Sequence, residues 1–478
     1  MHAEIDRSLP TELLLSVIDK VEHDEDLLLL ATASRHLHDL SMPVYFSRLN
    51  FDPGSKSLSL KSFDGCYRTL SGLAISLDII GTSLHDLSYD FGYIHNPDHV
   101  IREVRLLTRY VAKLSSIDQV TLRLAIFPMT SKHWKAANIV LLHTILQKSC
   151  TSMHITTSQL SSLYEEPKSL RSLRPSDWLK DYWPAGVDPL TSGAKRLKVC
   201  SIQTFPTSLR PFYYHALQSS ASVLTDLSFK NLFGGGTDWG IMLANLQFPC
   251  LVRLAVTFGV IPRDPLVKFL AKHQNIQEFQ YHHIRYDPLP KRPARIDKAV
   301  FERLHTLTTT PEHILNFLPP MERMLALTNV VIMVEANFSA LEGALRCLAS
   351  CVNKITLSLE ITRTGLSFGV WFDTILRNGS AQAGRPEALL HCVEELVMDN
   401  GDWSFADDNV TTRLPVWLHL FPALRVLTLR EGGPALRLTS SLSEVRPWPP
   451  YIEALRDACP GIYIEWQHKH SVTVPLRG

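Results

Sequence analysis

Residues 223–229 read Val-Leu-Thr-Asp-Leu-Ser-Phe, and positions 224, 227 and 229 give the pattern apolar-x-x-apolar-x-apolar. The same pattern recurs at 251–256, 276–281 and 424–429. A short apolar segment of this kind is typical of a buried strand. The first apolar positions 224, 251 and 276 differ by 27 and 25 residues, which lies in the range of stacked structural repeats. The repetition predicts one strand in each of a series of repeats.

Weaker copies of the pattern, separated by helical periodicity, extend this series in both directions. The further predicted strands are 120–124, 197–202, 304–307, 355–359 and 393–398. The predicted helices are 97–114, 134–148, 209–219, 238–246, 265–273, 311–318, 338–350, 370–377, 410–420 and 451–458.

Alternating strands and helices with this period predict an α/β solenoid. One strand-helix unit cannot bury its own apolar face, but stacked units share a continuous core. We expect the strands to line a concave parallel sheet and the helices to cover the convex side. A doubly wound α/β fold also alternates strands and helices and is the alternative, but repeats of about 25 residues favour the solenoid.

The first fifty residues follow a different, helical pattern. Pro10 suits the first turn of a helix, where a missing N–H costs little, and Glu12 complements the helix dipole there. The acidic stretch 22–26 ends this helix, and two more helical runs follow before Pro43. An apolar stripe predicted to be buried consists of Leu13, Leu14, Val17, Ile18 and Val21. Since three short helices rarely close a core alone, we expect part of the leucine face to remain for a partner.

Residues 9 to about 46 resemble an F-box. The matching positions are Leu9-Pro10, Glu12, Leu13-Leu14, Asp26-Leu27-Leu28 and Ala33-Ser34-Arg35. The sequence departs from the family pattern at Ile18, where many relatives carry Phe, and at His36-Leu37-His38, where many carry Trp. An amphipathic helical cap on a larger domain is the alternative interpretation.

The F-box resemblance implies a partner and a set of contacts. In that family the module docks on the adaptor subunit of an SCF (cullin-RING) ubiquitin ligase, and through the adaptor on a cullin, while the rest of the chain selects a protein client. The implied adaptor-binding residues are Leu9, Pro10, Leu13, Leu14, Ile18, Leu27 and Leu28.

The turn-rich stretch between Phe51 and Gly65 predicts a domain boundary. We expect a helical module at 1–50, a linker at 51–65, repeats at 66–470 and a tail at 471–478. The repeats resemble degenerate leucine-rich repeats, although they lack the Asn that usually closes that motif. Predicted insertions, which could bind partners or pack on the rim of the solenoid, lie at 158–194, 285–299, 378–390 and 431–449.

Residues between the repeated apolar positions should point away from the helices, because side chains alternate along a strand. Their mixed charge suggests a protein ligand rather than a nucleic acid. The candidate client-binding residues are Asp226, Ser228, Lys230, Arg253, Thr257, Glu278, Gln280, His282, Glu395, Asp399, Thr428 and Arg430.

Composition sets further expectations for partners and location. The 478 residues include 48 basic and 47 acidic residues, a balance that does not favour nucleic-acid or membrane-surface binding. No signal peptide or spanning segment is recognisable, and the eight cysteines lie mostly in apolar segments. These features predict a cytoplasmic or nuclear protein with free thiols. Cys347 and Cys351 lie one helical turn apart without a second pair at zinc spacing, so we expect no metal or cofactor.

One motif argues for catalysis. Residues 365–369, Gly-Leu-Ser-Phe-Gly, match the turn that carries the nucleophilic serine of some hydrolases. However, residues 362–364 separate this turn from the preceding predicted strand, and the possible partners Asp373, Asp399 and His419 are common residue types. We therefore expect a non-catalytic substrate receptor. The alternatives are a repeat scaffold unrelated to ubiquitin and a serine hydrolase that uses Ser367.

Overall fold

The computed structural model describes most of the chain in two compact units, 1–250 and 251–478, each with its own buried core. The described residues are 9–62, 66–92, 97–125, 132–157, 193–203, 209–230, 243–257, 263–282, 302–317, 325–334, 338–349, 351–361, 368, 390–400, 408–418, 421–431 and 450–468.

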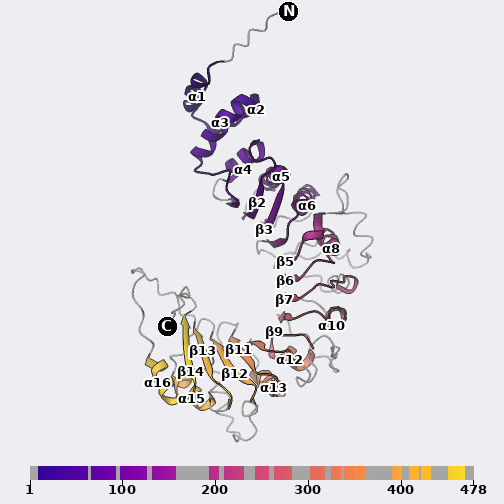
Figure 1. Ribbon diagram of the computed structural model, residues 1–478, viewed down its shortest axis with the longest axis vertical. Helices are drawn as coiled ribbons and strands as arrows, with labels where there is room; N and C mark the ends of the chain where they lie inside the picture. Colours follow the sequence, from indigo (N-terminus) through magenta and orange to yellow (C-terminus); the bar gives the residue numbers. More distant parts are fainter. Residues whose placement is uncertain are drawn as a thin grey trace, which may run out of the picture. The chain divides into compact units, whose positions relative to one another are not determined.

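The first unit begins with three helices and continues as strand-helix repeats (Figure 1). Its helices are α1 (Thr11–Asp19), α2 (Asp24–Ala33), α3 (Arg35–Arg48), α4 (Cys66–Ile75), α5 (Pro97–Lys113), α6 (Lys132–Gln147) and α8 (Arg210–Ser219), with a 3₁₀ turn at Gly193–Arg196. Its strands are β1 (Ser57–Lys61), β2 (Ser83–Asp90), β3 (Ser116–Leu124), β4 (Ser152–Thr157), β5 (Val199–Gln203) and β6 (Asp226–Lys230).

The second unit consists of further strand-helix repeats. Its strands are β7 (Arg253–Thr257), β8 (Glu278–His282), β9 (Thr306–Thr309), β10 (Asn329–Val334), β11 (Ile355–Ile361), β12 (Val393–Asp399), β13 (Val426–Glu431) and β14 (Tyr463–His468). Its helices are α10 (Arg263–Lys272), α12 (Pro311–Phe317), α13 (Phe338–Leu348), α15 (Asp408–Leu418) and α16 (Pro450–Ala458).

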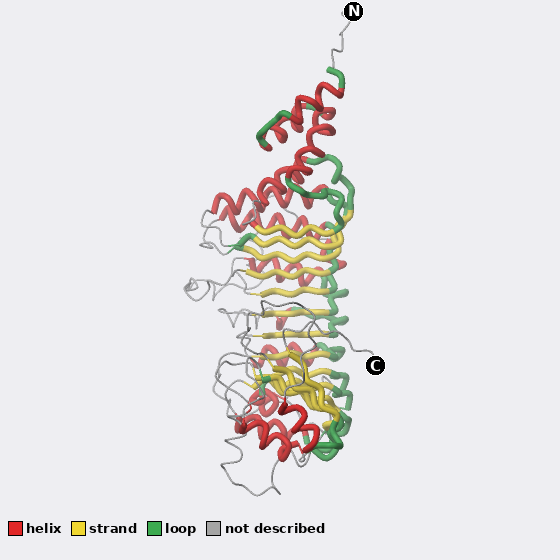
Figure 2. Tube along the Cα trace, turned by 90° about the vertical axis from the view of Figure 1, so that its left-hand side faces the viewer, coloured by secondary structure: helices red, strands yellow, loops and turns green. Residues whose placement is uncertain are grey.

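Within each unit the strands are parallel and follow one another in sequence order, side by side (Figure 2). The predicted α/β class with a parallel repeat sheet is therefore confirmed. Parallel neighbours in sequence order need a crossover after every strand. In the described connections helices such as α5, between β2 and β3, and α13, between β10 and β11, supply it. In both units the helices lie along one face of the strands (Figure 1).

The repeated apolar pattern marks the face of the strands that packs against the helices. All twelve of its positions in the four clearest copies are at least 91% buried: Leu224, Leu227, Phe229, Leu251, Leu254, Val256, Ile276, Phe279, Tyr281, Leu424, Leu427 and Leu429. The parallel register places equivalent positions beside one another, as for Leu254 and Phe279. The pattern therefore specifies both the strands and the layer that they bury.

Five strands were not predicted, namely β1, β2, β4, β10 and β14. At β4 the three apolar positions of the pattern are Cys150, just before the strand, Met153 and Ile155, and all three side chains are buried. Because none of them is leucine, this repeat was not recognised from the sequence. β1 pairs in parallel with β2 although it lies inside the predicted linker, so the sheet begins earlier than expected. Helix α4 was also missed.

Helix α3 corrects the predicted end of the third helical run. The helix continues through Pro43 to Arg48. Proline removes one backbone hydrogen bond and normally ends a helix. Here Pro43 is exposed, while Tyr45 and Phe46 in the next turn are buried at 0% and 3% exposure, so tertiary packing retains the last turn.

Several predictions fall on residues that the structure does not describe. The insertions at 158–194, 285–299, 378–390 and 431–449 lie almost wholly outside the described residues. The tail 471–478, the predicted helix 370–377 and most of the predicted helix 238–246 lie there as well.

Candidate functional site

The first candidate site is a set of exposed apolar side chains on α1, just before it and on α2, which we call the exposed leucine surface. It consists of Leu9, Leu13, Val17 and Leu29, whose exposure ranges from 54% to 66%. Leu15, which is 37% exposed, lies on the opposite side of α1. Leu13 and Val17 lie four residues apart and so share one side of α1. The expectation that the whole α1 stripe is buried was therefore wrong for these two residues, while the expected apolar surface is present.

Other members of the predicted adaptor-binding set differ in exposure. Leu9, Pro10 and Leu13 are exposed, and Leu14 and Leu28 are half-buried. Ile18 and Leu27 are 1% and 0% exposed. Their prediction as surface contacts is corrected, because α1 and α2 both pack against α3 and use these side chains in their own small core.

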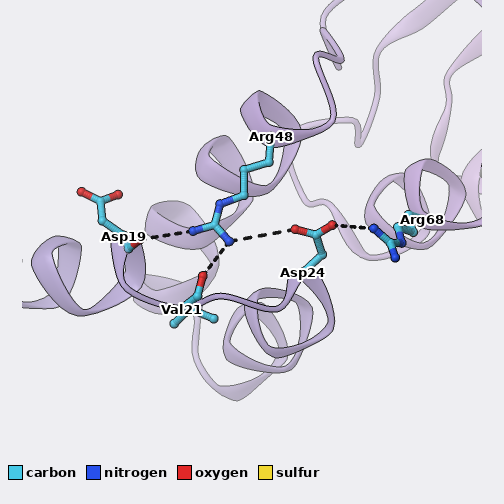
Figure 3. A network of polar contacts seen from close by, with 5 residues as sticks. All are labelled: Asp19, Val21, Asp24, Arg48 and Arg68. Carbon is cyan, nitrogen blue, oxygen red and sulfur yellow. Dashed lines mark hydrogen bonds and ion pairs between the residues drawn. The ribbon is translucent and has the colours of Figure 1, made fainter.

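A network of polar contacts fixes the connection between α1 and α2 (Figure 3). The Arg48 guanidinium donates from Nη1 to the Val21 carbonyl at 2.6 Å and from Nη2 to the Asp19 carbonyl at 3.3 Å. Asp24, in the first turn of α2, lies 4.0 Å from Arg48 and 3.1 Å from Arg68 of α4. The carbonyls at the end of α1 therefore have a cationic partner, and α2 is linked to the first repeat helix.

The three-helix module is attached to α4 by buried contacts. The Tyr45 hydroxyl donates to the Arg68 carbonyl at 2.6 Å, and the Leu77 N–H donates to His38 Nε2 at 3.0 Å. A Cβ on Gly72 would lie 2.6 Å from Tyr45 Cε1, so the ring lies directly on the helix backbone. Burial is the main cause that raises the pKa of Tyr45. These contacts fix the module on the first repeat despite the turn-rich segment between them.

The second candidate site is the face of the strands that points away from the helices, which we call the polar strand face. In the second unit it carries an ion pair between Arg253 and Glu278 at 3.2 Å. Arg430 Nε donates to Gln467 Oε1 at 3.0 Å. Among the predicted client-binding residues, Lys230, Arg253, Glu278 and Glu395 are exposed, and Asp226, Ser228, Gln280 and Arg430 are half-buried.

Four predicted client-binding residues are buried, which corrects the expectation that they are open to a ligand. Thr257, His282, Asp399 and Thr428 are 4%, 0%, 8% and 7% exposed. The parallel register explains this for Thr428, because the short side chain lies between Val397 and Glu465 of the neighbouring strands. Its hydroxyl donates to Glu465 Oε2 at 3.3 Å.

The polar strand face also contains residues that sequence reasoning missed. In the first unit, Arg123 and Asp90 form an ion pair at 3.2 Å across β2 and β3. His154 lies 3.1 Å from the Ser152 hydroxyl, and burial and the nearby Lys230 lower the pKa of its imidazole. These residues alternate with buried apolar positions in β2, β3 and β4, and this alternation could have placed them on the polar strand face from the sequence.

The catalytic alternative has little described structure around it. Ser367, Asp373 and His419 lie outside the described residues. Phe368 is described, and its backbone N–H donates to Oδ1 of the buried Asn400 at 3.2 Å. In the described part of the chain, no cluster of three or more His, Cys, Asp or Glu side chains could hold a metal ion.

A helix that crosses a bilayer needs about 20 mostly apolar residues. None of the helices within the described ranges has both that length and that apolar character.

Comparisons with known proteins give structural likenesses but no sequence match. No family model matches the chain, and no curated protein matches its sequence. The chain is similar to a solved structure described as the crystal structure of the Rad7 and Elc1 complex in yeast, with 12% sequence identity and a TM-score of 0.34. The alignment covers 96% of this chain and 98% of that one.

Proposed function

We propose that this chain is an F-box-type substrate receptor with leucine-rich-repeat-like repeats. The exposed leucine surface docks on the adaptor of an SCF (cullin-RING) ubiquitin ligase, and the polar strand face binds a protein client. The observation that carries the proposal is the exposure of Leu9, Leu13, Val17 and Leu29 on a module that covers Ile18 and Leu27. In this proposal the chain itself performs no catalysis.

The size of the exposed leucine surface suits a protein partner. Burying one leucine or valine side chain contributes about 1.5–3 kcal/mol, whereas association costs at least about 4 kcal/mol. One residue cannot support a complex, but several buried together can. The acidic residues Glu12, Asp19 and Asp26 near this surface favour a partner with complementary basic groups.

The attachment of the module to α4 supports the presentation of a client. Ubiquitin transfer by proximity needs the client held at high effective concentration near the activated ubiquitin. The contacts of Tyr45, Gly72 and His38 hold the module on the first repeat helix, so an adaptor docked on the module is tethered next to the repeats.

Binding of the purified adaptor to the full chain tests the first half of the proposal. Leu13→Asp and Val17→Asp each place a charge in the exposed leucine surface, and we expect each to weaken adaptor binding by about tenfold or more, since 1.4 kcal/mol is tenfold in affinity. Thr11→Asp is the matched control. It adds the same charge to α1 on the side opposite Leu13, at the end where the helix dipole favours it.

The outcomes separate the proposal from its alternatives. Equal adaptor binding by wild type, L13D and V17D would refute docking through this surface. No adaptor binding by the wild type would instead favour a repeat scaffold whose helices bind another partner. Hydrolysis of an ester substrate that is lost in Ser367→Ala would support the hydrolase and contradict a non-catalytic receptor.

A further inference from the structure

Two cysteines meet at the beginning of two neighbouring repeats in the second unit. Cys351 follows α13 and precedes β11, and Cys392 immediately precedes β12. β11 and β12 are adjacent (Figure 1) and parallel, and the register places Ile355 opposite Val393. The Ile355 N–H donates to the Cys392 carbonyl at 2.7 Å, so the backbones on which the two cysteines lie are in direct contact.

Both cysteines contact the same carbonyl at the end of α13. The Cys351 N–H donates to the Leu348 oxygen at 2.9 Å, and the Cys392 sulfur lies 3.4 Å from that oxygen. The two side chains also interact directly by a hydrogen bond from the Cys351 thiol to Cys392.

The surroundings activate one sulfur of the pair. The hydrogen bond from Cys351 is the main cause that lowers the pKa of Cys392. Burial acts in the opposite direction, and the nearby Lys354 ammonium lowers the pKa further. Lys354 is held there by a hydrogen bond to the His391 carbonyl at 3.3 Å and an ion pair with Glu394 at 3.5 Å. The same hydrogen bond raises the pKa of Cys351, which keeps its proton.

A second pair of cysteines provides a comparison within the same chain. Cys150 precedes β4 and Cys200 lies in β5, and the two interact electrostatically. They are 0% and 1% exposed, and burial raises the pKa of each to about 12. Cys351, in contrast, is partly exposed, whereas its partner Cys392 is 5% exposed. Thiolate character and access decide which thiols are oxidised.

We propose that Cys351 and Cys392 form a peroxide-sensitive dithiol that closes to a disulfide between the two repeats. The Cys392 thiolate attacks hydrogen peroxide, the O–O bond breaks, and the hydroxide that leaves takes up the proton lost by that thiol to become water. Cys392 is then a sulfenic acid. The Cys351 sulfur displaces the hydroxyl group, which leaves with the Cys351 proton as a second water. Two thiols and one peroxide thus give one disulfide and two waters.

Oxidation of the full chain by hydrogen peroxide tests this inference. The protein is reduced, exposed to stoichiometric peroxide, alkylated and digested, and the peptides are identified by mass spectrometry. We expect a Cys351–Cys392 linkage to form at least about tenfold faster than any linkage of Cys150 to Cys200, because each unit of pKa changes the thiolate fraction tenfold. A dominant Cys150–Cys200 linkage, or equal alkylation of all four cysteines after oxidation, would overturn the proposal.

Variants distinguish the pair from general thiol reactivity. Cys250→Ser removes an exposed cysteine elsewhere and should leave formation of the linkage unchanged. Cys347→Ser should also leave it unchanged, and loss of the linkage in that variant would show that Cys347 takes part in the oxidation and would contradict a mechanism with two cysteines. Cys351→Ser should allow the sulfenic acid at Cys392 to be trapped by a dimedone probe, and no trapped adduct would contradict the proposed order of steps. The inference does not depend on the proposed ligase function.

Discussion

The three-helix module and the repeats handle their apolar residues in opposite ways. In the repeats, strand positions such as Leu227 and Leu254 are 1% exposed, because stacked strands and helices cover them from both sides. In the module, Leu13 and Leu29 are 54% and 66% exposed. Leucine side chains are therefore buried where repeats stack on both sides, whereas some stay exposed where only three short helices are present.

The strongest predicted contrast in stability is between truncation of a buried leucine in the repeats and truncation of an exposed leucine in the three-helix module. Leu227→Ala removes a side chain buried between the strands and helices of the first unit and should lower the free energy of unfolding by about 2–5 kcal/mol. Leu13→Ala should change it by no more than about 0.5 kcal/mol. Denaturant unfolding measures both. Similar losses in the two variants would contradict the difference in burial.

A second prediction concerns the attachment of the module to α4. Gly72→Ala places a Cβ 2.6 Å from the Tyr45 ring and should lower the free energy of unfolding by about 1–3 kcal/mol. Alanine normally stabilises a helix interior relative to glycine by up to about 1 kcal/mol, so the sign of the effect reports the clash. Thermal unfolding and hydrogen exchange in α3 and α4 measure it.

Gly461→Ala is the control for this prediction, since a Cβ there meets no atom within 4 Å. We expect it to be nearly neutral. A stabilised Gly72→Ala variant would show that the module and the first repeat are not in close contact.

A smaller effect is expected from the polar network of the module. Asp24→Ala removes the carboxylate between Arg48 and Arg68 and should destabilise α1–α3 by about 1 kcal/mol, with the loss reduced at high salt. Asp26→Ala removes another acidic residue from the first turn of α2 and controls for the helix dipole. Hydrogen exchange of the module amides measures the difference. Equal effects of the two substitutions would assign the loss to the dipole alone.

The smallest expected effect is a pH dependence within the repeats. Burial lowers the pKa of His273 below 6.5, and its Nδ1 lies 2.6 Å from the Phe269 carbonyl. The unfolded chain therefore takes up a proton first, and the free energy of unfolding should fall as the pH drops through 6.5. His273→Gln should flatten this decrease in denaturant unfolding measured between pH 7.5 and 5.5. An unchanged slope would show that His273 is not responsible.

Much of the repeat architecture was predictable, since the spacing of apolar residues in a strand reports directly which face is buried. The prediction failed where Cys150 and Met153 filled positions usually held by leucine, and where the turn-rich segment around β1 concealed a short strand. For the candidate sites, residue types indicated which side chains are polar or apolar but not how far neighbours cover them. Thr428 and His282 alternate correctly along their strands, yet neighbouring side chains bury them.

Nine of the strands, most of the described helices and the leucine-rich helical start follow from local periodicity alone, so they could be predicted from the residues. Folding was needed to show that Ile18 and Leu27 are covered while Leu13 and Val17 are open, and that Cys351 lies beside Cys392. Coverage and contact depend on which segments pack together across the fold, and the spacing of residues along one segment does not contain that information.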